Sequence, residues 1–342
     1  MRERIQHMVP SYFSIVMATG ILGVAFSLEG WKLIAEAILL INALFFVGLV
    51  AALLYRLRNF MPAVMADLHS YQRAPGFLTF IPACCIMGNQ FVLVYGAISF
   101  AKVLLVLAGG VWFVMAYGLY FNLTITDHKE SLKDGINGSW LLFVVALQAI
   151  SVLITLTARN DQILLFSALC FFALGAIFYL YIMSLIIYRM SFFELHAAEL
   201  GAPYWINMGA TAITALAASM LILSADKFPL IKELIPFLKG IAIMFWAAGT
   251  WWIPLLIMLG IWKHVIKKTS IPTSAAGYDA SYWSLVFPLG MYTVSTLRLS
   301  VTLNLPFLGI ISHYFIFIVG LAWLSVFAGF IKRLMLILKN QF

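Results

Sequence analysis

Ten apolar segments run through the chain and constrain its fold more than any other feature. A helix needs about 20 residues to cross the hydrocarbon core of a bilayer, and each segment is close to that length. Several are separated by only a few residues, so consecutive segments are expected to pair as helical hairpins. The sequence predicts one all-α integral membrane domain over 1–342, with spans at 11–28, 33–55, 76–98, 101–121, 138–157, 162–188, 203–223, 236–261, 281–304 and 306–331.

The composition agrees with a chain that spends most of its length in lipid. It is 64% hydrophobic and only 10% charged, whereas a soluble domain is about 25% charged. The net charge of +8 is typical of basic cytoplasmic loops in a membrane protein, so it does not indicate a nucleic-acid partner. The lipid bilayer is therefore the expected surrounding.

Lysine and arginine are unequally divided between the two sides that alternating spans define. With the N-terminus inside, 14 of the 21 basic residues fall on the inner side and 7 on the outer side. Basic residues favour the cytoplasmic side of a membrane. We therefore expect an even number of spans with both termini in the cytoplasm, in the plasma membrane or a bacterial-type inner membrane.

A short motif opens each odd-numbered span, and its regular spacing suggests an internal repeat. A small residue or proline is followed by an aromatic residue, and the motif recurs about every 65 residues with a longer last interval, as a repeated unit would. The alternative is that the aromatics only mark the membrane interface. The five copies are Ser11-Tyr12-Phe13, Gly76-Phe77, Ser139-Trp140, Pro203-Tyr204-Trp205 and Ser281-Tyr282-Trp283.

Polar side chains distinguish the odd-numbered spans from the even-numbered ones, which are almost wholly apolar. Because polar groups are unfavourable against lipid, the odd spans are expected to form an inner ring and the even spans an outer ring. For single serine and threonine residues the alternative is hydrogen bonding between helices. The residues predicted to line a path through the inner ring are Ser14, Thr19, Asn89, Gln148, Asn207, Thr211 and Ser295.

The ninth span differs from an ordinary lipid-facing helix. Pro288 removes a backbone hydrogen bond and is expected to kink the helix. Such a kink in a membrane belongs where protein or water can satisfy the backbone, so the span is predicted to line a pore. Arg298 is the only basic residue well inside a span. It either attracts anions to the path or extends to the outer interface, and these readings stay open.

The sequence offers no readable catalytic constellation and no cofactor or metal motif, so no enzyme and no cofactor are predicted. The 13 carboxylates lie in loops or at the ends of spans. Carriers coupled to protons or sodium often place carboxylates inside the membrane. The distribution therefore favours passive anion flow, although a proton could still travel on a protonated substrate.

Three stretches resemble signatures of the tellurite-resistance/dicarboxylate transporter family. The run PSYFSIVMATGILG at 10–23 is similar to its first helix, and DLH at 67–69 with RAPGF at 73–77 is similar to its connection between the second and third helices. The run WSLVFP at 283–288 is similar to its ninth helix. The three motifs keep the family's order along the whole chain.

The resemblance implies ten transmembrane helices arranged as five hairpins, with quasi-fivefold symmetry around a central pore, in a homotrimer. It also implies that Phe287, next to Pro288, occludes the pore; the alternative is a ring packed between helices. Two functions stay open. One is a channel or facilitator for small inorganic or organic anions. The other is a secondary carrier or efflux permease for C4-dicarboxylates, sulfite or tellurite-related oxyanions.

Overall fold

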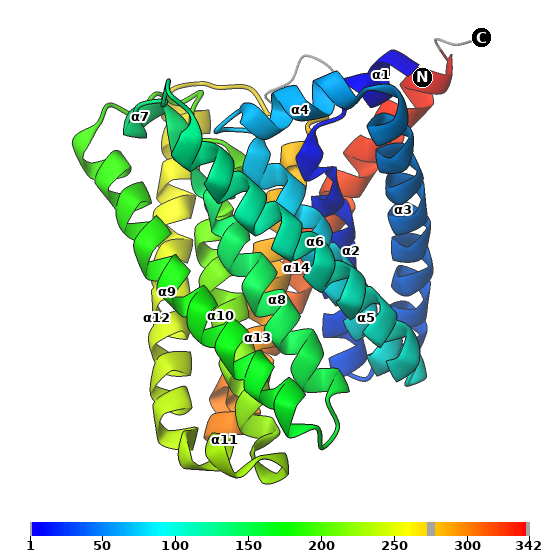
Figure 1. The fold of residues 1–342 in the computed structure, drawn as a ribbon, viewed down its shortest axis with the longest axis vertical. Coiled ribbons are helices and arrows are strands. Elements are labelled where there is room, and N and C mark those ends of the chain that lie inside the picture. Colours follow the sequence, from blue (N-terminus) through cyan, green and yellow to red (C-terminus); the bar gives the residue numbers. More distant parts are fainter. Residues whose placement is uncertain (1, 272–277, 340–342) are drawn as a thin grey trace.

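The computed structural model describes residues 2–271 and 278–339, and every regular element within them is helical (Figure 1). The odd-numbered segments form α2 (Ser14–Leu28), α5 (Phe80–Tyr95), α8 (Leu142–Thr157), α10 (Ile206–Leu223) and α13 (Trp283–Leu303). The even-numbered segments form α3 (Lys32–Asn59), α6 (Ile98–Ile125), α9 (Gln162–Phe192), α12 (Ile235–Ile261) and α14 (Pro306–Lys339). The predicted all-α membrane fold is confirmed.

Nine helices in the described ranges are long and apolar enough to cross a membrane, and α13 is not among them. Pro288, Arg298 and several hydroxyl residues reduce the hydropathy of α13. Its 21 residues still extend about 31 Å at about 1.5 Å per residue, which matches the hydrocarbon thickness. Ten membrane crossings therefore remain a prediction.

Burial separates the two sets of helices in the way their polar content predicts. In the spans built on α2, α5, α8 and α10, between 72% and 94% of the apolar window is buried. In α3, α6, α9, α12 and α14 the share is only 17–28%. Most of α13 is buried as well. The helices that carry polar side chains are thus enclosed by helices that present apolar side chains outward.

The five inner helices form a closed ring. Going round it, α2 contacts α5, α5 contacts α8, α8 contacts α10, α10 contacts α13, and α13 returns to α2. Each inner helix also packs against the outer helix that follows it in the chain, which gives five hairpins. Quasi-fivefold symmetry about the axis of this ring remains a prediction.

Each inner helix is preceded by a 3₁₀ turn, and the five turns contain the repeated motif of a small residue or proline and an aromatic. They are η1 (Pro10–Phe13), η2 (Ala74–Thr79), η3 (Gly138–Leu141), η4 (Ala202–Trp205) and η7 (Ala280–Tyr282). Proline lies in the first two positions of η1, η2 and η4, where its missing N–H leaves no hydrogen bond unmade. The turns contact one another in the same circular order as the helices.

The two ends of the bundle differ. The helix α1 (Arg2–Gln6), the end of α14, α4 (Met61–His69) and α7 (Leu132–Gly135) lie at one end, here called the termini face (Figure 1). The π-helix η6 (Trp262–Ile266) extends α12 toward this face. The opposite end, the far face, carries η5 (Ala225–Lys227) and α11 (Pro229–Glu233). Each inner helix runs from the termini face to the far face.

An ion-pair group made of buried Arg56, buried Asp67 and exposed Arg73 fastens α4 to the bundle at the termini face. Asp67 accepts from Nη2 of Arg56 at 2.6 Å, and Nε of Arg73 lies 3.0 Å from its other oxygen. Nε of Arg56 also donates to the backbone oxygen of Gln6 in α1. These contacts join α1, α3, α4 and the chain that leads into η2.

Candidate functional site

A cavity on the axis of the inner ring is lined by three residues from each inner helix. Its volume is about 30 Å³, which is enough for about two water molecules. On every helix the three residues are spaced i, i+3 and i+7, a spacing that keeps side chains on one helical face. The sets are Ile21, Val24 and Leu28; Ile86, Asn89 and Leu93; Ala149, Val152 and Leu156; Ile213, Leu216 and Met220; and Met291, Val294 and Arg298.

These fifteen residues form three layers along the axis. The mouth layer, toward the far face, is half-buried and consists of Leu28, Leu93, Leu156, Met220 and Arg298. The middle layer is buried except for half-buried Asn89 and consists of Val24, Asn89, Val152, Leu216 and Val294. The deep layer is at most 2% exposed and consists of Ile21, Ile86, Ala149, Ile213 and Met291. The exposure of the lining therefore decreases from the far face toward the termini face.

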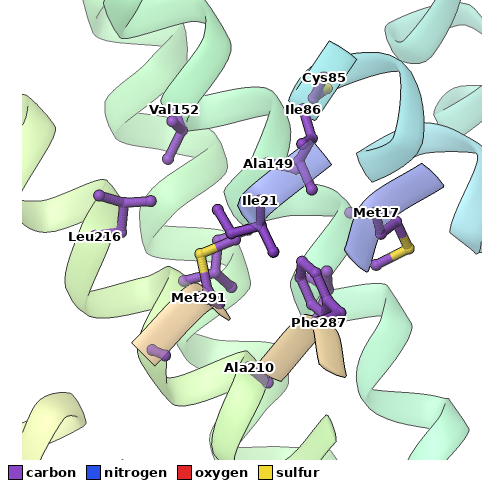
Figure 2. Packing of buried hydrophobic residues seen from close by; sticks show 14 of the residues in the cluster. Met17, Ile21, Cys85, Ile86, Ala149, Val152, Ala210, Leu216, Phe287 and Met291 are labelled. Atoms are coloured by element: carbon purple, nitrogen blue, oxygen red, sulfur yellow. The ribbon is translucent and has the colours of Figure 1, made fainter. Parts of the chain in front are cut away.

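The lining of this cavity does not extend to the helical turn below the deep layer. Stepping back four residues on each inner helix gives a fourth set, here called the gate layer after the role predicted for Phe287: Met17, Pro82, Val145, Gly209 and Phe287. All five are buried, and Phe287, which contributes the only aromatic ring, is 1% exposed. Figure 2 shows Phe287 and Met291 projecting from α13 into the same apolar cluster as Met17 and Ile21.

The helix that carries Phe287 is held closely against its neighbour. A Cβ atom added to Gly209 would lie 2.9 Å from Cγ of Pro288 and 3.1 Å from its Cβ, closer than the usual carbon–carbon contact of about 3.5–4.0 Å. Only glycine in α10 allows this approach. α13 continues through Pro288 as one helix, although proline cannot donate the backbone hydrogen bond of its position.

Two of the predicted site residues, Asn89 and Arg298, line the cavity, and they are its only polar members. Within the described residues Arg298 forms no ion pair. Oδ1 of Asn89 has no hydrogen-bond partner there either. Arg298 lies at the mouth and is half-buried, so it borders the axis and is also close to the far face.

Thr19 and Gln148 contact outer helices instead of the cavity. Oγ1 of Thr19 accepts from Nε1 of Trp323 in α14 at 3.0 Å. Nε2 of Gln148 donates to the backbone oxygen of Phe172 in α9 at 3.0 Å, and Gly175 leaves room for the amide. For these two residues the alternative noted for small polar side chains, hydrogen bonding between helices, describes the geometry.

The other four polar residues predicted to line the path are buried but do not line this cavity: Ser14, Asn207, Thr211 and Ser295. Oγ1 of Thr211 donates to the backbone oxygen of Met208, and Thr211 lies against Gly249 of α12. Oγ of Ser295 donates to the backbone oxygen of Tyr292. Asn207 has no partner for either polar atom of its amide among the described residues.

Most of the lining is apolar, so the polar side chains of the sequence did not identify it. The signal that would have found it is the repeat itself. The deep-layer residues Ile21, Ile86, Ala149 and Ile213 are separated by about 64 residues, close to the period of the aromatic motif. Aligning the five segments on this motif, and then selecting the positions of one helical face, would have identified the lining residues of each helix.

Comparison with known proteins relates the chain to transport proteins. Residues 7–331 match the family described as voltage-dependent anion channel. An uncharacterized membrane protein of Mycobacterium tuberculosis is 36% identical over 156 residues, covering 46% of this chain and 76% of that protein. An uncharacterized transporter of Methanocaldococcus jannaschii is 27% identical over 310 residues, covering 85% and 83%.

A sulfite efflux pump of Trichophyton rubrum is 24% identical over 348 aligned positions, covering 93% of this chain and 88% of that protein. These names and the family match agree with the predicted resemblance. The family is of transporter and channel type, and its members move anions across membranes. The chain belongs to the voltage-dependent anion channel family.

Proposed function

We propose that this protein is an anion channel or facilitator whose path runs along the axis of the inner ring, and that Phe287 closes this path in the state described. One observation carries the proposal: all five inner helices contribute the same three positions to one axial cavity, which ends at the gate layer. A path bordered by every inner helix is the arrangement that a conducting pore requires.

The charges along the path support anions as the permeant ions. Among the fifteen described residues that line the cavity, Arg298 is the only charged one, and none is a carboxylate. A basic residue at a pore mouth favours anions and disfavours cations. The absence of carboxylates from the lining also favours passive flow over coupling to protons or sodium.

The gate layer would block ions in two ways. The Phe287 ring fills the axis, and the apolar neighbours Met17, Val145 and Ile21 offer no hydrogen-bond donors. An anion that sheds water there finds no compensating partner, so the constriction acts as a dewetted barrier. Pro288 weakens the helix beside the ring, which supports movement of the ring at modest energetic expense.

The experiment compares Phe287→Ala with Phe143→Ala in planar bilayers or proteoliposomes. Both rings are 1% exposed and lie on inner helices, but Phe143 stacks on Trp140 and Phe178, away from the axis. Each substitution is expected to destabilise the fold by about 3–5 kcal/mol. Only Phe287→Ala should raise basal anion conductance. Equal conductance in the two folded variants would exclude Phe287 as the gate.

The second candidate function is a secondary carrier or efflux permease for sulfite, C4-dicarboxylates or tellurite-related oxyanions. The similarity to a sulfite efflux pump over 93% of the chain supports it. Currents that reverse at the Nernst potential of the anion would indicate a channel. Saturable uptake that depends on a proton gradient would indicate a carrier.

We also propose a homotrimer in the plasma membrane with both termini in the cytoplasm. The excess of basic residues on the termini face supports this orientation. The apolar outer surfaces of α3, α6 and α14 offer area for lipid and for partner copies. Native mass spectrometry in nanodiscs measures the number of subunits, and labelling of a cysteine placed in α1 in intact cells measures the orientation.

A further inference from the structure

We propose that the mouth and middle layers form a binding site for one monovalent oxyanion, held by Arg298 and Asn89, which fills from the far face while the gate layer is closed. The site deepens the proposed function and rests on it for the axial path. A basic residue that only attracts anions to the pore mouth would not bind one ion saturably. The site proposed here should bind an anion saturably while the gate layer is closed.

Arg298 provides the charge and the geometry. It is the only charged residue among the fifteen that line the cavity, and within the described residues no carboxylate pairs with it. A guanidinium offers donors in a planar fork, which matches two oxygens of an oxyanion better than it matches a spherical halide. Its half-buried position lets an anion reach it from the far face.

Asn89 provides the second contact. It belongs to the middle layer, about 6 Å deeper along the axis at about 1.5 Å per residue for four residues. Oε1 of the adjacent amide, Gln90, accepts from Nδ2 of Asn42 at 2.6 Å, whereas the amide of Asn89 forms no side-chain hydrogen bond among the described residues. Nδ2 of Asn89 is the donor that can meet an oxygen of the anion, whereas Oδ1 is an acceptor and can meet only a hydroxyl group of a protonated anion.

The remaining surroundings limit the ion to a single charge. The other thirteen lining residues are apolar, and about 30 Å³ leaves no room for a full hydration shell. Dehydrating a dianion is far more unfavourable than dehydrating a monoanion. The five inner helices also end around the mouth, and their terminal carbonyl groups carry partial negative charge. One guanidinium can compensate one negative charge against these effects.

The closed gate layer makes the site accessible from one side only. Exposure decreases from the half-buried mouth layer to at most 2% in the deep layer, and Phe287 below it is 1% exposed. An ion that enters from the far face therefore reaches Arg298 and Asn89 without passing Phe287. Binding should be measurable in the parent protein when no current flows.

The experiment titrates the purified protein in nanodiscs with nitrate, chloride and sulfate at constant ionic strength, using calorimetry and thermal unfolding. The variants are Arg298→Gln, Asn89→Leu and, as matched control, Lys239→Gln, which removes a half-buried charge on α12 outside the cavity lining. Nitrate is planar with one charge, chloride is spherical, and sulfate carries two charges, so the three probes separate shape from charge.

We expect the parent protein to bind nitrate saturably, chloride more weakly and sulfate not measurably. Arg298→Gln should weaken nitrate binding about tenfold to a hundredfold, since a hydrogen bond to a charged group is worth about 1.5–3 kcal/mol. Asn89→Leu should weaken it about twofold to tenfold, and Lys239→Gln should leave it unchanged. If Arg298→Gln does not fold, Arg298→Lys keeps the charge and should weaken nitrate more than chloride.

Three results would overturn the site. They are no saturable nitrate binding to the parent protein, nitrate binding by the Arg298 and Asn89 variants that is as tight as that of the parent, and tighter binding of sulfate than of nitrate. Failure of the proposed function gives a different result, which is nitrate binding that depends on Arg298 but no anion conductance in Phe287→Ala. Conductance in Phe287→Ala without saturable binding would leave the axial path standing and remove the site.

Discussion

Replacing Gly209 with alanine tests the close contact beside Phe287, the proposed gate. The added Cβ would lie 2.9 Å from Cγ, 3.1 Å from Cβ and 3.3 Å from Cα of Pro288. A relaxed carbon–carbon contact is about 3.5–4.0 Å, so α13 must move away from α10 by roughly half an ångström or more. Proline is rigid and forms part of the backbone, so it cannot yield by changing a rotamer. The residue that moves with it is Phe287.

The expected change in stability is a balance of two effects. Overpacking a buried site destabilises a protein by about 1–3 kcal/mol. Alanine is favoured over glycine within a helix by about 1 kcal/mol. The net destabilisation should therefore be about 0–2 kcal/mol. The functional effect should be larger than the stability effect suggests, because a small shift of α13 widens the gate layer and raises basal anion flux.

The matched control is Gly240→Ala, in the outer helix α12, where an added Cβ meets no atom within 4 Å. This variant should be as stable as the parent or up to about 1 kcal/mol more stable, with unchanged flux. Unfolding in detergent and anion flux in proteoliposomes measure both quantities. If Gly209→Ala matches Gly240→Ala in stability and in flux, the contact between α10 and α13 does not hold the gate.

Two further predictions concern charged residues at the two faces. Asp67→Asn leaves Arg56, which is 1% exposed, without its ionic partner, and should destabilise the protein by about 3–5 kcal/mol in thermal unfolding; a loss below about 1 kcal/mol would show that the pair contributes little. Arg298→Gln should reduce anion flux more at low ionic strength than near 1 M salt, because the Debye length shortens from about 10 Å at 0.1 M to about 3 Å at 1 M. If Arg298→Gln and the parent protein have equal anion flux at each salt concentration, Arg298 faces the interface instead of the path.

The arrangement of the helices could be predicted from the sequence because burial follows polarity in a membrane. Lipid cannot satisfy polar groups, so the contrast between odd and even spans was enough to assign the inner and outer rings. The repeated motif of a small residue or proline with an aromatic marked the five 3₁₀ turns, of which η1 and η4 are examples. Local chemistry at these turns is visible without tertiary information.

The lining of the cavity could not be predicted from polarity. Thr19 and Gln148 use their polar atoms to hold α14 and α9, so polar content identified the inner helices but not the face toward the axis. Residues that form hydrogen bonds between helices and residues that line a water-filled path are of the same types, so the sequence does not distinguish them. Only the relative rotation of each helix, which tertiary packing sets, distinguishes the two. Asn89 and Arg298 line the cavity, whereas Thr211 and Ser295 do not.

The most direct test of the axial path is chemical block of the current in a variant with an enlarged gate. In Phe287→Ala, with Cys84, Cys85 and Cys170 replaced by alanine or serine, a cysteine is introduced either at Val294 or at Thr211. Val294 lies in the middle layer, whereas Thr211 is buried against Gly249 of α12. A small anionic thiol reagent added from the far face should abolish most of the anion current of Val294→Cys and leave that of Thr211→Cys unchanged. Mass spectrometry measures how completely each cysteine is modified. If the current of Val294→Cys persists after complete modification, or if the reagent blocks only the current of Thr211→Cys, the axial path is contradicted.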